Sequence, residues 1–167
     1  MFEVGEYIVY GSKGVCQIEG ITHLDISGAD KERLYYVLAP LGDSNGKIYA
    51  PADNQKIAMR RVITKAEADK LIQELPEIEM LWVQDERQRE NKYKEALRTC
   101  DYRAWVSIVK TLHTRMEERT AQGKKITALD EKYMRMAENE LYSELSLTLG
   151  IPKNEMEGYI RMQLKDA

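Results

Sequence analysis

The residues best suited to chemistry in this sequence are a tryptophan and the basic side chains that follow it. Trp82 stands directly before a stretch whose middle residues are all polar. An exposed indole can wedge or stack against bases where a minor groove is distorted, while neighbouring cations contact phosphates. The candidate DNA-binding residues are therefore Trp82, Arg87, Arg89, Lys92 and Lys94.

Trp82 also has a second interpretation, as a core residue. Tyr93 follows eleven residues later, about three helical turns. In one unbroken helix the two rings would share a face with Leu97 and Cys100, which is the pattern of a packed stripe. Periodicity alone favours this packed interpretation. Trp105 differs, because Ile108, Val109, Leu112 and Met116 continue its stripe, and we expect it to be packed.

The charge distribution supports a local site for a polyanion. The net charge is −3, but residues 62–86 hold two basic and seven acidic side chains, whereas residues 87–125 hold eleven basic and five acidic ones. Local cations displace the counterions that are condensed on nucleic acid, so a basic stretch inside an acidic chain can bind DNA. The alternative is that these charges simply form solvated helix faces.

Nothing in the sequence indicates catalysis, a metal site or a cofactor. The two histidines, His23 and His113, fall in different halves of the chain, and no nucleophile, phosphate-loop or zinc motif occurs. Cys16 and Cys100 lie far apart without a CxxC neighbour, so we expect ordinary packed thiols. The sequence predicts a binding protein without catalytic residues, not an enzyme.

Composition and length set the remaining bounds. The 167 residues, 43% of them hydrophobic, are enough for two small domains with cores of their own. No apolar run approaches the roughly 18 residues of a membrane span, and the first residues do not resemble a signal peptide. We expect a cytoplasmic monomer that does not contact a membrane.

Residues 1–61 are expected to form a small antiparallel barrel or strongly bent sheet. Short strands are predicted at 7–10, 15–21, 34–38 and 47–50, and residues rich in glycine, aspartate and asparagine separate them. Cys16, Ile18, Leu34, Tyr36 and Leu38 alternate with their neighbours and should face the core. A sheet this small has edges, which either add a strand from a partner or are covered by the other domain.

Residues 62–167 follow a helical period and should form an all-α bundle. The first helix begins at the capping box led by Thr64 and is broken by Pro76. A second helix is predicted from about residue 77 to 99, a third from Asp101, and a fourth from Thr127 with Asp130 at the capping-box position. Gly150 ends the fourth helix, and a short final helix follows Pro152.

Several segments resemble the CarD/CdnL family of bacterial transcription regulators. The opening Phe2 to Gly11, followed by Lys13-Gly14-Val15, is similar to the start of these proteins, and the stretches 35–38, 48–54 and 93–102 have counterparts in the family. The resemblance implies a Tudor-like or SH3-like barrel that binds the RNA polymerase β subunit. It also implies a helical domain that contacts promoter DNA at the upstream edge of the bubble, where a tryptophan stabilises the open complex.

The resemblance assigns site residues with two departures. Leu24 and Tyr49 stand where many relatives have arginine, so Leu24, Lys47 and Tyr49 become the candidate polymerase-binding residues. The wedge tryptophan of many relatives lies about one helical turn closer to the next helix. Matching it to Trp82 requires a shift, but the resemblance favours an exposed Trp82 over a packed one.

The alternative function is a Tudor-like peptide-binding adaptor whose helices only support the β domain. The two functions differ in their response to salt, because several phosphate contacts make binding weaken steeply as salt rises. An adaptor would not bind DNA.

Overall fold

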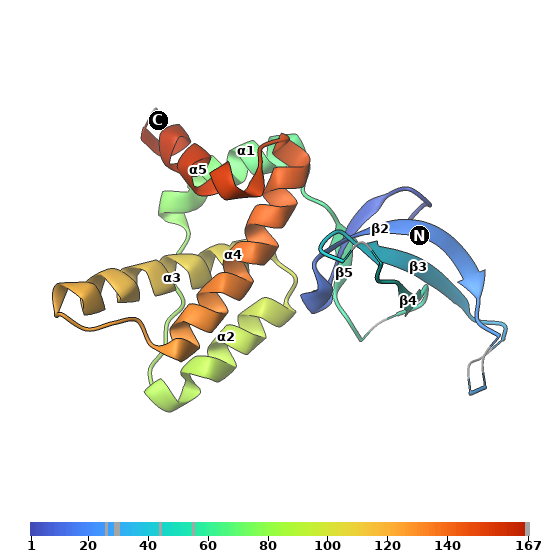
Figure 1. Ribbon diagram of the computed structural model, residues 1–167, viewed down its shortest axis with the longest axis horizontal. Helices are drawn as coiled ribbons and strands as arrows, with labels where there is room; N and C mark the ends of the chain where they lie inside the picture. Colours follow the sequence, from blue (N-terminus) through green and yellow to red (C-terminus); the bar gives the residue numbers. More distant parts are fainter. Residues whose placement is uncertain (26, 29–30, 44, 55, 166–167) are drawn as a thin grey trace. The chain divides into compact units, whose positions relative to one another are not determined.

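A computed structural model describes residues 1–25, 27–28, 31–43, 45–54 and 56–165, which divide into two units. Met1–Val62 form the first unit and Ile63–Ala167 the second, one residue from the expected boundary. All strands in the described part of the chain belong to the first unit, and all α-helices belong to the second (Figure 1).

The first unit is an antiparallel sheet of five strands in the order β4-β3-β2-β1-β5. The strands are β1 (Tyr7–Tyr10), β2 (Val15–His23), β3 (Leu34–Pro40), β4 (Ile48–Pro51) and β5 (Met59–Arg61). The four predicted strands are confirmed. β5 was not predicted, because the sequence Met59-Arg60-Arg61 has no apolar alternation; it pairs with the buried strand β1, where Arg60 lies opposite Val9.

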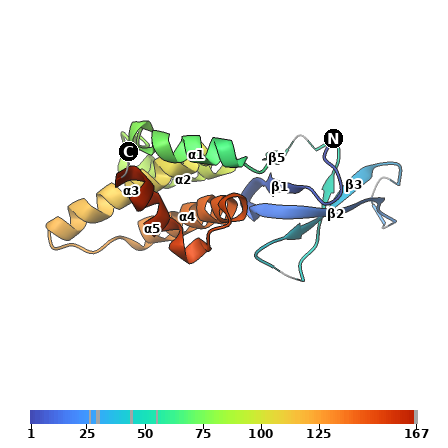
Figure 2. The ribbon, with the colours of Figure 1, turned by 90° about the horizontal axis from the view of Figure 1, so that it is seen from above.

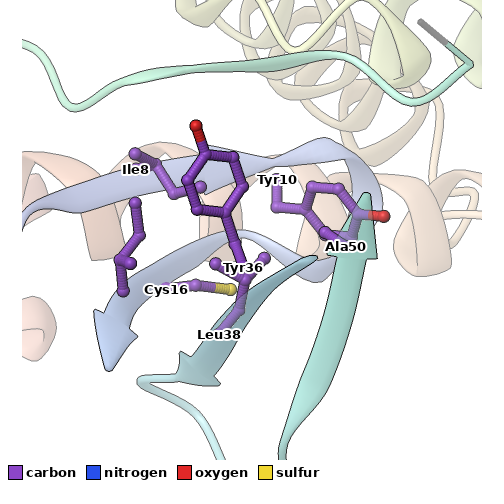
Figure 3. Packing of buried hydrophobic residues seen from close by; sticks show 7 residues of the cluster. Ile8, Tyr10, Cys16, Tyr36, Leu38 and Ala50 are labelled. Carbon is purple, nitrogen blue, oxygen red and sulfur yellow. The ribbon is translucent and has the colours of Figure 1, made fainter. Parts of the chain in front are cut away.

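One face of this sheet carries the core of the first unit (Figure 3). Its buried members are Ile8, Tyr10, Cys16, Ile18, Tyr36, Leu38 and Ala50. The hydroxyl of Tyr36 also accepts a hydrogen bond from the backbone N–H of Phe2 at 3.1 Å, which ties the N-terminal segment to the sheet. The prediction that Leu34 is buried is wrong, since it lies at the first position of β3 and is partly exposed.

The second unit contains five α-helices within its described residues (Figures 1 and 2). They are α1 (Lys65–Glu74), α2 (Arg89–Arg98), α3 (Tyr102–Ala121), α4 (Ala128–Leu149) and α5 (Met156–Lys165). Short 3-10 turns, η2 (Leu75–Glu77), η3 (Glu86–Gln88) and η4 (Lys153–Glu155), precede or follow them. α3 and α4 pack against each other and are joined by the connection 122–127, which is visible at one end of this unit in Figure 2. In the described part of the chain no helix is long and apolar enough to cross a membrane.

The predicted helix starts are confirmed by their capping bonds. The Thr64 side chain accepts from the N–H of Glu67, and Asp101 accepts from the N–H of Arg103. Thr127 accepts from the N–H of Asp130. Each bond satisfies a backbone donor that has no partner inside the first helical turn.

The predicted second helix is wrong over its first half. Residues 78–85 are neither helix nor strand, and α2 begins only at Arg89. Pro76 lies in the 3-10 turn that follows α1, and it cannot donate a backbone hydrogen bond to continue that helix. Asp85 then starts a new turn, because its side chain accepts from the N–H of Arg87. The face that Trp82 would share with Tyr93 does not exist.

A second core lies among α2, α3 and α4. Its buried members are Tyr93, Ala96, Ile108, Leu112, Tyr133 and Ala137. Trp105 is 1% exposed, so the prediction that it is packed is confirmed. Cys16 and Cys100 are both buried free thiols, as expected.

Glu140 of α4 makes stability depend on pH. One of its carboxylate oxygens, Oε2, is buried without a hydrogen-bond partner among the described residues. Burial raises the pKa of Glu140 to about 7, and Glu144 adds to this effect while Lys153 opposes it. A raised folded-state pKa means that the contribution to stability is complete below the unfolded pKa and is lost as pH rises through the folded pKa.

We therefore expect Glu140→Gln to raise the free energy of unfolding above pH 7, by about 1–3 kcal/mol, and to leave it little changed near pH 4. Urea unfolding followed by helical circular dichroism between pH 4 and 8 measures this. The exposed Glu155→Gln is the matched control. Equal pH profiles for Glu140→Gln and the unmodified protein would contradict the prediction.

Candidate functional site

Trp82 projects from the surface of the helical unit. Its side chain is 74% exposed, and Met80 is half exposed. Leu81, between them, is partly buried and packs against the core of α2, α3 and α4. Leu81 therefore faces inward and Trp82 faces solvent, so the interpretation of Trp82 as a core residue is wrong.

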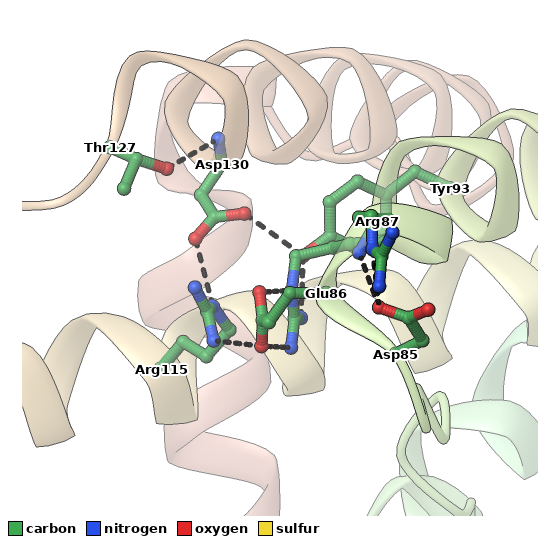
Figure 4. Close-up of polar contacts among 8 residues, drawn as sticks. Asp85, Glu86, Arg87, Tyr93, Arg115, Thr127 and Asp130 are labelled. Carbon is green, nitrogen blue, oxygen red and sulfur yellow. Dashed lines mark hydrogen bonds and ion pairs between the residues drawn. The ribbon is translucent and has the colours of Figure 1, made fainter.

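The turn that follows Trp82 is held by an ion pair between a buried arginine and the surface residue Glu86 (Figure 4). Arg89 donates from Nε and from its second terminal nitrogen to the two carboxylate oxygens of Glu86, at 2.9 and 2.8 Å. This bond, ahead of the other influences, raises the pKa of Arg89 and lowers that of Glu86. Arg89 is 8% exposed, which corrects the expectation that it is available to phosphates.

Arg89 belongs to a chain of contacts that ends at a buried carboxylate. It donates to the hydroxyl of Tyr93 at 3.0 Å, and that hydroxyl donates to Asp130 at 2.9 Å. Burial raises the pKa of Tyr93 to about 12, so the phenol stays protonated at neutral pH. Arg115 of α3 donates to the other Asp130 oxygen at 2.9 Å and lies 3.5 Å from Glu86 (Figure 4).

Three of the predicted cations are exposed in the described structure. Arg87 is almost wholly exposed and lies 3.7 Å from Asp85. Lys92 is exposed on α2. Lys94 is half exposed and lies 3.6 Å from Glu90. These pairs are solvated, so they are weak and would not prevent contact with phosphates.

Other basic residues of the 87–125 stretch have structural contacts instead. Arg103 pairs with Glu74, Lys110 donates to backbone carbonyls, and Arg119 donates to the carbonyl of Lys125. The count of eleven basic side chains therefore overstates the charge that is free to meet a polyanion. The place of each basic residue in the folded unit decides whether its side chain is exposed or is bonded to another part of the protein.

Lys132 of α4 is an exposed cation that the sequence argument missed. Its ammonium lies 5.4 Å from the ring centre of Tyr133. The Tyr133 hydroxyl donates to Glu90 at 2.9 Å, and this bond, followed by the charges of Lys94 and Lys132, lowers the pKa of Glu90. Lys132 and Lys94 therefore lie near the same carboxylate. Their separation of 38 positions gave no local sequence signal.

The first unit carries a mixed polar and apolar face beside its β4 edge. Tyr49 of β4, 48% exposed, pairs with Val37 of β3, which pairs with Gly20 of β2. The register of β2 shifts between Ile18 and Gly20, so Glu19 is the extra residue of a bulge. Its carboxylate lies 3.6 Å from the ammonium of Lys47, and both side chains are about half exposed.

The candidate polymerase-binding residues do not all lie together. Lys47 and Tyr49 lie at the β4 edge of the sheet. Leu24 follows β2 at the end where His23 pairs with Leu34, four residues beyond Gly20, and it is only partly exposed. Lys47 and Tyr49 can therefore contact one small surface, whereas Leu24 lies beyond that part of the sheet.

The histidines occupy unrelated places. His23 ends β2 in the first unit and is exposed. His113 of α3 lies 2.9 Å from Glu138 of α4, a bond that raises the pKa of His113. Among the residues that the structure describes, no group of three or more His, Cys, Asp or Glu side chains could hold a metal ion.

Comparison with known proteins identifies the first unit. Residues 2–63 match the family model of the CarD-like/TRCF RID domain, a domain that interacts with RNA polymerase. The matched range covers all five strands and ends at the first residue of the helical unit. No curated protein matches the chain. The resemblance of the opening residues is confirmed, and the match indicates a transcription-related role in binding RNA polymerase.

The different burial of the two tryptophans predicts different costs of truncation. Trp105→Ala should lower the free energy of unfolding of the helical unit by about 3–5 kcal/mol, because it removes a packed ring. Trp82→Ala should change it by less than about 1 kcal/mol, as is usual for surface positions. Chemical denaturation followed at 222 nm measures both. Similar losses for the two variants would contradict the described packing.

Proposed function

We propose that this chain, whose residues 2–63 form a CarD-like/TRCF RID domain, is a bacterial regulator of transcription initiation that binds two partners. The Tudor-like or SH3-like β unit binds the RNA polymerase β subunit. The helical bundle binds promoter DNA at the upstream edge of the bubble and modulates the stability of the open complex. The observation that carries this proposal is the exposed Trp82 beside exposed cations, in a chain whose residues 2–63 match a polymerase-interacting domain.

The face beside β4 supports the polymerase contact. An edge strand can pair with a strand of a partner, and side chains beside the edge then give specificity. β4 is an edge strand, and Tyr49 offers a large amphipathic ring there. Aromatic residues are enriched at the centres of protein interfaces. Lys47 forms a solvated ion pair with Glu19 and could bind a carboxylate of the partner in its place. Leu24 would add an apolar contact from the end of β2.

The surface around Trp82 supports the DNA contact. An indole that is 74% exposed buries much apolar area when it stacks on a base or enters a minor groove. Arg87, Lys92 and Lys94 can contact phosphates on either side, and such contacts position a protein without reading sequence. Arg89 supports this surface from inside the protein and does not itself reach DNA.

We also propose that the chain acts by binding and not by catalysis, and that it needs no cofactor. The two histidines lie in different units, and the bond from His113 to Glu138 ties two helices together. The buried Arg89 and the partly buried Arg115 have carboxylate partners that account for their position.

The polymerase contact predicts a loss of binding when the β4 face is changed. In a pull-down with purified RNA polymerase β subunit, the full chain should be retained, and Tyr49→Ala should weaken retention about tenfold or more, as expected for an aromatic hot spot. Val4→Ala, which changes another exposed apolar side chain, should bind normally. If the double variant Tyr49→Ala with Lys47→Glu bound the β subunit as well as the unmodified chain, this assignment would be contradicted.

The DNA contact predicts a shorter lifetime of the open promoter complex in Trp82→Ala. Stacking of one base on an aromatic ring is worth about 1–3 kcal/mol, so dissociation should accelerate roughly fivefold to one-hundredfold. Competitor-challenge kinetics on a linear promoter fragment measure the lifetime, and retention on the β subunit should not change.

A charge variant tests the phosphate contacts separately. Lys92→Gln with Lys94→Gln should reduce the salt dependence of promoter-complex formation by about one per contact removed, similarly on different promoters. A complex whose stability does not depend on salt, and on which Trp82→Ala has no effect, would favour the peptide-binding adaptor instead.

A further inference from the structure

The segment that carries Trp82 is held in place although it lacks regular secondary structure. Residues 78–85 connect η2 to η3 and run past α3 in Figure 1. Backbone N–H and C=O groups outside helices and strands still need partners when water is excluded. Two consecutive side chains from the middle of α3, Lys110 and Thr111, supply such partners to Ile78 and Leu81.

Lys110 anchors the start of the segment. Its ammonium donates to three backbone carbonyls, those of Leu75 at 2.9 Å, Pro76 at 3.3 Å and Ile78 at 2.5 Å. An ammonium has three donors, and here each has an acceptor. The carbonyl of Leu75 also accepts from the backbone N–H of Ile78 at 3.3 Å, so Lys110 binds a turn that already closes where the chain leaves α1. Lys110 therefore fixes the point from which the segment starts.

Thr111 anchors the residue next to Trp82. Its hydroxyl accepts the N–H of Leu81 at 2.7 Å and donates to the carbonyl of Ser107 at 2.6 Å. Thr111 is 8% exposed, so this hydroxyl is largely shielded from water. Removing it would leave the Leu81 N–H without its acceptor, at a cost greater than that of a solvated bond.

The other end of the segment is fixed independently. Asp85 accepts from the N–H of Arg87, and Glu86 is bonded to Arg89 and lies near Arg115. The chain is thus attached to the helices immediately before and shortly after Trp82. Between these points Leu81 packs inward and the indole points outward.

We propose that Thr111 and Lys110 are positioning residues for Trp82, which hold the indole in the orientation that it has when it binds. This inference rests on the proposed function of Trp82 at promoter DNA. A side chain that is already ordered loses less conformational entropy on binding, so a fixed loop binds more tightly than a mobile one with the same contacts. Thr111 acts through the Leu81 backbone and does not itself touch DNA.

The test compares Thr111→Val with Thr111→Ser. Valine keeps the shape and removes the hydroxyl, whereas serine keeps the hydroxyl and removes a methyl group. The full-length protein labelled with 5-fluorotryptophan gives one ¹⁹F resonance for each tryptophan, and Trp82→Phe assigns them. We expect Thr111→Val to change the shift and relaxation of the Trp82 resonance only, and to expose the Leu81 amide to faster hydrogen exchange. Thr111→Ser should retain the normal values.

The promoter assay links this order to binding. Thr111→Val should shorten the open-complex lifetime by about three- to tenfold, the equivalent of one lost hydrogen bond, while Thr111→Ser should not. In Trp82→Ala, adding Thr111→Val should shorten the lifetime no further, because Thr111 acts through the indole. Lys110→Met provides a second variant with the same expected pattern if Thr111→Val does not fold.

The outcomes separate this inference from the proposed function. If Trp82→Ala shortens the lifetime but Thr111→Val and Lys110→Met change neither the lifetime nor the Trp82 resonance, the positioning role is overturned. Equal defects in Thr111→Val and Thr111→Ser would also overturn it, since the hydroxyl would then not be the cause. If Trp82→Ala has no effect on the lifetime, the proposed function fails, and the ¹⁹F and exchange measurements alone decide whether Thr111 orders the indole.

Discussion

The helical unit depends on one buried carboxylate. Asp130 is fully buried, and an isolated charge in such a place would be strongly destabilising. It is compensated by Arg115 of α3 and by the Tyr93 hydroxyl of α2, while its own backbone N–H is bonded to Thr127. Because the partners come from two other helices, the need to satisfy this one side chain fixes how α2, α3 and α4 meet.

The same network extends to the surface. Tyr93 also accepts from Arg89, and Arg89 is held by Glu86 in the turn that precedes α2. A change in the interior of the helical unit, at Asp130 or Tyr93, can therefore alter the turn that lies a few residues after Trp82. Loss of one partner of a buried charge typically costs more than the net contribution of the intact pair, so this network specifies one arrangement of the turn.

The network also divides the basic residues of the helical unit into two groups. Arg89 is itself buried and pairs with Glu86, and Arg115 pairs with the buried Asp130, whereas Arg87, Lys92 and Lys132 stay exposed to solvent. In the β unit a local irregularity has a similar effect. The bulge at Glu19 turns a carboxylate outward to meet Lys47, while the residues on either side stay in register with β3.

The sequence by itself determined the two units, four of the five strands and the helix starts at Thr64, Asp101 and Thr127. These features depend on local patterns, in which alternation, capping residues and glycine act within a few positions of one another. It also identified Trp105 as packed, since the apolar residues of one helix continued its stripe. The resemblance of the opening residues identified the polymerase-interacting domain.

Only the tertiary structure decided that Trp82 is exposed and that Arg89 is buried. The helical period predicted a helix from about residue 77 to 99, but Ile78 and Leu81 bond to α3 instead, through Lys110 and Thr111, about 30 positions away. Arg89 lies in a basic run and was expected to be free, yet it is bound by Glu86 and Tyr93. Lys132 lies near the same carboxylate as Lys94, Glu90, because α2 and α4 meet there, and this proximity is not visible in the sequence. Contacts between residues distant in the chain have no local signature, and they decided which aromatic ring is exposed and which charges remain free.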